Sequence, residues 1–302
     1  MINKRPKSGF TLIELLVVMS IIAVLLSILM PSLGKARKSA MMQKDASRVR
    51  SIHAGWLTWA TSHDERYPTP GLVNRLEDYQ GLQIKGRGPE DKEANTTDNV
   101  HSLSVMNNLY NADFIVSDNE PSDNVFILED YDYDQYNAGN QSVFGVDADT
   151  YWDDSLNVDL ADGGEGCNVS YASMPLIGER KEKEWTSGGS SSFAILSNRG
   201  PLVDDTGQAP FRSLTYEIHG NGLSWVGNVC WQDNHITREE SLVPVGCVYP
   251  TGEMDNIFNA CLNGLCNPWA GDTWLVLVSE LNETGGDAFP FMLSPALEWD
   301  DE

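Results

Sequence analysis

Residues 10–30 read FTLIELLVVMSIIAVLLSILM, and Glu14 is the only ionisable side chain in this stretch. A helix of this length is about 31 Å long, which matches the hydrocarbon thickness of a bilayer. Pro31 and Ser32 follow instead of a small-residue cleavage site, which disfavours a removable secretory signal peptide. The stretch therefore predicts a membrane-crossing helix.

The charges of the chain are divided at about residue 50. Residues 1–50 hold nine Lys or Arg and two Asp or Glu, whereas residues 51–302 hold 11 and 42. A basic, apolar stem is thus joined to a large acidic body, and the two parts belong in different solvents. The net charge of −24 argues against nucleic acid as a partner, because phosphate binding depends on Lys and Arg.

Glu14 is the residue in the apolar segment that needs an explanation. A carboxylate inside a membrane helix costs about 3 kcal/mol on insertion scales, so it marks a functional site by default. The alternative is that the side chain reaches the headgroup region, since it lies only four residues inside Phe10.

The residues around Glu14 also form a motif. From Lys7 to Glu14 the chain reads KSGFTLIE, which resembles the prepilin motif of type IV pilins and type II secretion pseudopilins. The resemblance implies a basic leader over residues 1–9, cleavage after Gly9 by a prepilin peptidase, and N-methylation of the new terminal residue, Phe10. It also assigns Pro31 to a position where these helices often carry a proline.

The resemblance implies assembly partners as well. Glu14 would face the new amino group of Phe10 in a neighbouring subunit, and each partner would be costly to bury alone. The expected partners are the prepilin peptidase/methyltransferase, other pilin or pseudopilin subunits in a homo- or hetero-filament, and the inner membrane. The protein would cross that membrane once, with its body in the periplasm or, in an assembled filament, outside the cell.

A helical pattern continues beyond the apolar segment, over residues 31–62. Its apolar positions form one stripe, and basic residues mark the wetted side. The stripe consists of Leu33, Ala36, Ala40, Met41, Val49, Ile52, Trp56, Trp59 and Ala60. We expect one long stem helix that is kinked or locally unwound near Pro31.

Residues 63–302 predict an acidic head rich in β-structure. Strand-like runs occupy residues 125–128, 192–196, 214–218, 226–231 and 273–278, and residues 102–114 suggest a short helix. This order predicts an α+β fold, in which a long N-terminal helix, transmembrane in its first half and amphipathic in its second, packs on an antiparallel sheet. Pilin-like proteins have the same arrangement.

The last third of the chain carries a second resemblance. Its residues are His219, the stretch from Gly227 to Ile236 that reads GNVCWQDNHI, and the stretch from Asp255 to Phe258 that reads DNIF. Together they resemble the large pseudopilin-like families of planctomycetes. The stretch from Ser197 to Pro201 is similar to a turn that precedes this motif. Within the stretch 227–236, Asn234 stands where these families usually have a turn glycine.

Two explanations of the motif compete. Asp233 and Asn234 suit a two-residue hairpin turn, because Asn tolerates a positive φ. Alternatively, Asp233, His235 and His219 would gather as a catalytic or metal-binding cluster.

The alternating acids Asp130, Asp132 and Asp134 resemble a calcium loop. They fail the EF-hand pattern, because Gln135 and Gln141 stand where Gly and Glu are needed. Calcium bound somewhere in residues 130–165 and a solvated acidic face are the two alternatives, and no other cofactor is expected.

The five cysteines are Cys167, Cys230, Cys247, Cys261 and Cys266, with no metal-binding spacing. Cys261 and Cys266 could close a loop as a disulfide, because an extracytoplasmic head permits oxidation.

The sequence therefore predicts a filament subunit, and not an enzyme, since no nucleophile elbow, Walker loop or zinc-protease motif is present. The alternative is a membrane-tethered binding module, an adhesin or carbohydrate-binding head rich in exposed Trp.

Overall fold

The structure is a computed structural model. It describes residues 11–75, 87–135, 151–160, 165–203, 208–248, 254–259, 261–262, 265–266, 274–281 and 291–292. The chain divides into two compact units, residues 1–43 and residues 44–302, and each is described by itself below.

Helix α1 runs from Leu12 to Ala60 and belongs to both units. Its first part is apolar, with a mean hydropathy of 2.9 over its best 18 residues, and is long enough to cross a membrane. The side chains of this part are exposed, as expected for a surface whose solvent is lipid.

The helix is unbroken at Pro31, so the expected local unwinding is not found. Proline removes one backbone donor. The hydroxyls of Ser20, Ser27 and Ser32 bond to carbonyls one turn earlier in the helix, at Val17, Val24 and Leu29. These polar groups are therefore satisfied without a partner from outside the helix.

The centre of the second unit is a four-stranded antiparallel sheet in the order β1-β2-β3-β4. The strands are β1 (Tyr171–Ser173), β2 (Ala194–Asn198), β3 (Gly227–Trp231) and β4 (Ile236–Glu239). The sheet is continued beyond β1 by an isolated antiparallel bridge between Ser173 and Val276. The first three strands are completely buried, whereas β4 is partly exposed at the edge.

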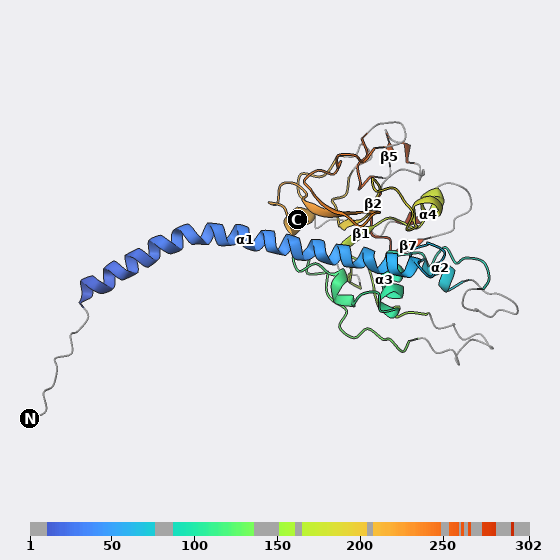
Figure 1. Cartoon of the computed structure of the whole chain (residues 1–302), viewed down its shortest axis with the longest axis horizontal. Coiled ribbons are helices and arrows are strands. Elements are labelled where there is room, and N and C mark those ends of the chain that lie inside the picture. Colours follow the sequence, from blue (N-terminus) through green and yellow to red (C-terminus); the bar gives the residue numbers. More distant parts are fainter. Residues whose placement is uncertain are drawn as a thin grey trace, which may run out of the picture. The chain divides into compact units, whose positions relative to one another are not determined.

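Residues 44–60 of α1 pack against this sheet (Figure 1). Val49, Ile52 and Trp56 are fully buried there, in one core with Leu196 and Val229 of the central strands. Their spacing of three and four residues places them on one face of the helix. The predicted α+β architecture, with the far half of a long helix on an antiparallel sheet, is confirmed.

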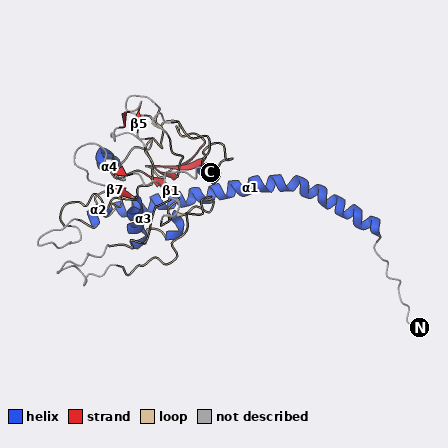
Figure 2. Ribbon diagram, turned by 180° about the vertical axis from the view of Figure 1, so that it is seen from behind, coloured by secondary structure: helices blue, strands red, loops and turns tan. Residues whose placement is uncertain are grey.

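The remaining described elements are short, and most of the head consists of loops (Figure 2). The helices are α2 (Pro70–Val73), α3 (Thr97–Met106), the 3-10 helix η1 (Ala112–Ile115), α4 (Gly178–Glu184) and α5 (Thr215–Ile218). Two hairpins complete the set: β5 (Cys261–Leu262) with β6 (Leu265–Cys266), and β7 (Glu280–Leu281) with β8 (Phe291–Met292).

Four of the predicted local structures are wrong. Of the strand expected over residues 273–278, the described residues 274–278 make only an isolated bridge, at Val276. Residues 214–218 form helix α5 instead of a strand. At its start the Ser213 hydroxyl bonds to the Thr215 hydroxyl and accepts a hydrogen bond from the Thr215 backbone N–H. Residues 125–128 make only an isolated bridge, at Val125. The helix expected over residues 102–114 begins earlier, at Thr97, and is separated from η1 by a turn in which Asn108 has a positive φ of 55°.

Candidate functional site

The start of α1 holds Glu14 in a capping box. The backbone N–H and the hydroxyl of Thr11 both donate to Glu14 Oε2, at 2.8 and 2.9 Å, and the Glu14 N–H donates back to Thr11 Oγ1 at 3.3 Å. This reciprocal arrangement satisfies donors that a helix start otherwise leaves open. It also gives the carboxylate a fixed position at the N-terminal end of the apolar segment. Gly9 and Phe10 lie outside the described residues.

A second polar site lies on α1 where the helix meets the sheet, and its centre is Asp45. The Asp45 side chain is 3% exposed. Four donors reach its carboxylate, each from a different place in the head: Tyr171 Oη at 2.5 Å, Asn198 Nδ2 at 2.7 Å, His219 Nε2 at 2.8 Å and Asn228 Nδ2 at 3.2 Å. We call these five residues the Asp45 lock.

The electrostatics of the lock favour the ionised acid. Burial by itself raises the pKa of Asp45, but the bonds from His219, Tyr171 and Asn198 outweigh it and lower that pKa below its usual value. The same site raises the pKa of Tyr171 far above its usual value, first through burial and then through the charge of Asp45. Tyr171 therefore stays a neutral donor to a charged acceptor.

Asn119 fixes the orientation of the His219 ring. Its amide Nδ2 lies 3.3 Å from His219 Nδ1, and an amide nitrogen only donates. The ring is thus held between Asn119 at Nδ1 and the Asp45 carboxylate, which accepts from Nε2.

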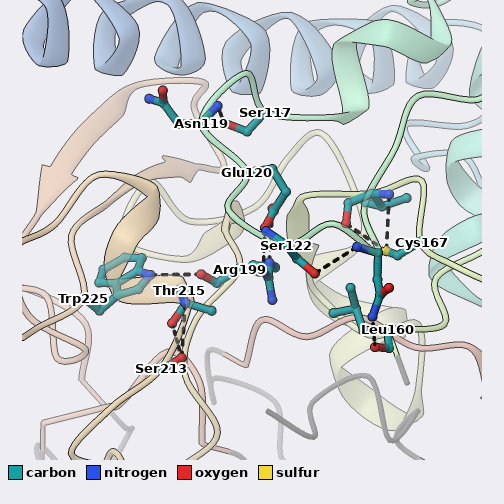
Figure 3. A network of polar contacts seen from close by, with 12 residues as sticks. Ser117, Asn119, Glu120, Ser122, Leu160, Cys167, Arg199, Ser213, Thr215 and Trp225 are labelled. Atoms are coloured by element: carbon teal, nitrogen blue, oxygen red, sulfur yellow. Dashed lines mark hydrogen bonds and ion pairs between the residues drawn. The ribbon is translucent and has the colours of Figure 1, made fainter. Parts of the chain in front are cut away.

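Figure 3 shows a buried ion pair between Arg199, which follows Asn198 of the lock in the sequence, and Glu120. Arg199 and Glu120 form two parallel contacts, with Nε to Oε2 at 3.2 Å, and their side chains are only 8% and 3% exposed. The Trp225 indole donates to the Arg199 carbonyl at 3.0 Å. Such forked pairs define geometry as well as charge, so the segment after β2 is held in place on both sides.

Two glycines of the same motif allow close packing. A Cβ at Gly200 would lie 2.4 Å from the ring of Phe258, and one at Gly227 would lie 2.3 Å from the ring of Trp225. Both glycines therefore provide space for an aromatic ring. The motif stretches 197–201, 219, 227–236 and 255–258 thus come together, and they do so around the junction of helix and sheet.

The predicted catalytic or metal cluster is not assembled. His219 is bound to Asp45, whereas Asp233 and His235 pair with each other in the exposed turn between β3 and β4. That turn has three residues, 232–234, because the Trp231 N–H donates to the His235 carbonyl and Asn234 adopts a φ of 65°. The hairpin is confirmed, although its turn is one residue longer than expected.

The acids proposed for calcium do not converge in the structure. Asp130, Asp132 and Asp134 are exposed, and Asp132 Oδ1 accepts the backbone N–H of Asp134. Within the ranges described above, no group of three His, Cys, Asp or Glu is placed to hold a metal ion. Calcium in residues 130–165 stays a prediction, since part of that range lies outside the described residues.

Three of the five cysteines are core residues. Cys167, Cys230 and Cys247 are buried and are not disulfide-bonded, and burial raises the pKa of Cys167 to about 12. The backbones of Cys261 and Cys266 are register partners in the β5–β6 hairpin. Their disulfide stays a prediction that this backbone pairing favours.

The tryptophans do not form an exposed binding face in the part of the head that the structure describes. Trp56, Trp152, Trp185, Trp225, Trp231 and Trp274 are buried, and Trp59 is half-buried. The exposed tryptophans expected for a carbohydrate-binding head are thus absent from this part.

The sequence signal for Asp45 was present but was not recognised. Asp45 is the only acid among the basic residues of 31–50, and it lies four and seven residues before Val49 and Ile52, on the buried stripe. A single charge on an apolar stripe indicates a partner in the body it packs on.

Residues 4–30 match the family model described as the prokaryotic N-terminal methylation motif. No curated protein and no solved structure gives a significant match to the chain. The match covers residues 4–9 of the expected leader, the expected cleavage site and the whole apolar segment.

Proposed function

We propose that this type IV prepilin-like chain is a structural subunit of a type IV pilus-like filament or a type II secretion pseudopilus. A prepilin peptidase would cut after Gly9 and methylate Phe10, and the apolar half of α1 would then pack among the same segments of other subunits. The acidic head would lie in the periplasm or on the filament surface. The observation that carries this proposal is the match of residues 4–30 together with a helix that is apolar enough to cross a membrane.

The capping box supports a specific role for Glu14 in assembly. Its carboxylate already accepts from Thr11 at the helix start, so it is oriented toward the end where cleavage creates a new cationic amine. Leaving one partner of such a pair alone in an apolar bundle costs about 3–5 kcal/mol. A subunit packed in the wrong register would leave one of the two charges unpaired and would be destabilised by this amount. The pair therefore favours the correct register.

Intact-mass measurement tests the processing step. Protein from cells with prepilin peptidase should lack residues 1–9 and carry one additional methyl group. Protein from cells without the peptidase should retain its full length. A mature protein that keeps its leader in normal cells would instead favour the membrane-tethered binding module.

A matched pair of variants tests the assembly step. Glu14→Ala should be cleaved normally but should reduce filaments at least tenfold, because the new amine loses its acidic partner. Ser20→Ala is the control, since the Ser20 hydroxyl bonds only within the helix, to Val17. Filaments at normal abundance in the Glu14 variant would exclude the pairing mechanism.

A further inference from the structure

A buried polar cluster lies away from the Asp45 lock, where α4 meets the segment before α3. Lys181 of α4 is 6% exposed and is the only buried lysine among the residues that the structure describes. Its Nζ contacts Oε1 of Glu90. The same oxygen accepts a hydrogen bond from Asn95 Nδ2 at 2.7 Å, and Asn95 is 2% exposed. One carboxylate oxygen thus joins a primary amine and a carboxamide.

The carbonyl of that carboxamide is also engaged. The backbone N–H of Gly71 donates to Asn95 Oδ1 at 2.9 Å. A side chain at position 71 would prevent this approach, since a Cβ there would lie 1.8 Å from the Asp91 carbonyl oxygen and 3.0 Å from Asn95 Oδ1. Asn95 therefore has a donor on its oxygen and a proton acceptor beside its nitrogen.

Amide transfer requires groups of these kinds. A primary amine, a carbonyl polarised by a fixed backbone donor, and a carboxylate that accepts a proton lie together, and the side chains of Lys181 and Glu90 are only 6% and 17% exposed. We infer that Lys181 and Asn95 become joined by an amide bond between Lys181 Nζ and Asn95 Cγ, with Glu90 as the proton carrier.

The chemistry balances without any further reactant. Glu90 takes a proton from the Lys181 ammonium, and the neutral amine attacks Asn95 Cγ while the Gly71 N–H stabilises the oxyanion. Glu90 then returns a proton to Nδ2 as the second Nζ proton leaves. The Cγ–Nδ2 bond breaks, and the products are one secondary amide and one ammonium ion.

The position of the bond suits a subunit that bears mechanical tension in the proposed filament. It would join the segment before α3 to α4, one turn before Trp185, whose ring packs 5.0 Å from that of Trp56 in α1. A covalent link at this point would hold the loops around the end of α1 even when non-covalent contacts yield.

Peptide mapping of the purified full-length protein tests the inference. A protease that cleaves after glutamate should release residues 94–120 joined to residues 180–182, with a mass lower than their sum by one ammonia. Glu90→Gln keeps a polar group but cannot carry the proton, and Lys181→Arg removes the nucleophile, so both variants should give separate peptides. Lys183→Arg, on the same helix but exposed, should retain the link.

Other outcomes overturn the inference. Separate peptides from the unmodified protein would show that the cluster is only a buried ion pair. A link that survives in Asn95→Ala, with loss of water, would place the bond on Glu90 instead. Neither result bears on leader cleavage or on filament formation, so this inference and the proposed function fail independently.

Discussion

Asp45 shows how one residue determines the way the stem helix is attached to the head. Its carboxylate accepts from β1, from the end of β2, from β3 and from the segment after α5. Apolar contacts along α1 would tolerate sliding or rotation of the helix by a few degrees. A buried charge with four fixed donors does not, so the lock specifies register more than it adds stability.

Replacing Asp45 tests this role directly. Asp45→Asn removes the charge and turns an amide group toward donors, so we expect a loss of about 3 kcal/mol in the free energy of unfolding. Urea unfolding of the full-length protein in detergent, followed by Trp fluorescence, measures it, because all nine tryptophans lie in residues 51–302.

Lys44→Ala provides the control for that measurement. Lys44 precedes Asp45 on the helix and pairs with Asp118, but it is 59% exposed. Exposed pairs contribute less than about 1 kcal/mol. Equal losses in the two variants would contradict the lock.

Among the helices and strands, the sequence predicted those that are determined by a local pattern of apolar and turn residues. The unbroken apolar run predicted the first half of α1, and alternation with a turn residue predicted the β3–β4 hairpin. Residues 214–218 were misassigned because a short apolar run fits a buried helix as well as a strand. The second resemblance groups three of the donors, but Asp45 could not be joined to them from the sequence, because hydrogen-bonded partners that lie more than 100 residues apart leave no local pattern.

The turn after β2 provides a prediction at this level. Gly200→Ala would place a methyl group 2.4 Å from the Phe258 ring, so the ring or the turn must shift. We expect a loss of about 1–3 kcal/mol, the usual cost of overpacking, seen as a lower midpoint of thermal unfolding.

Gly188→Ala is the matched control, since no atom lies within 4 Å of its added Cβ. A change at such an open position is expected to be within about 1 kcal/mol of neutral. If the two alanine variants melted at the same temperature, the contact between residues 200 and 258 would not constrain the turn.

At the scale of the whole molecule, the head contains several ionisable groups whose burial couples its stability to pH. Burial lowers the pKa of His53 to about 4 and that of His101 to about 3. Both histidines are neutral in the folded head but gain a proton on unfolding below their usual pKa of 6.5. Burial raises the pKa of Asp98 to about 6, so Asp98 acts in the opposite direction below that pH.

Stability should therefore fall as the pH is lowered from 7 to 5. Each histidine contributes a loss of about 1.4 kcal/mol per pH unit below its unfolded pKa, and below pH 6 Asp98 offsets one of them. The net loss by pH 5 should be about 2–3 kcal/mol, as measured by urea unfolding at each pH. His101→Gln should flatten the dependence and Asp98→Asn should steepen it; an unchanged slope in the His101 variant would refute the assignment.

The sequence distances within the lock have a consequence for biogenesis. Tyr171, Asn198, His219 and Asn228 follow Asp45 by 126 to 183 residues. If the body is exported in sequence order after the membrane helix, Asp45 stays unpaired on an apolar helix face until β3 has been exported. Contacts this distant in sequence close slowly, so we expect the head to fold only after translocation is nearly complete, and export chaperones to be needed most during that interval.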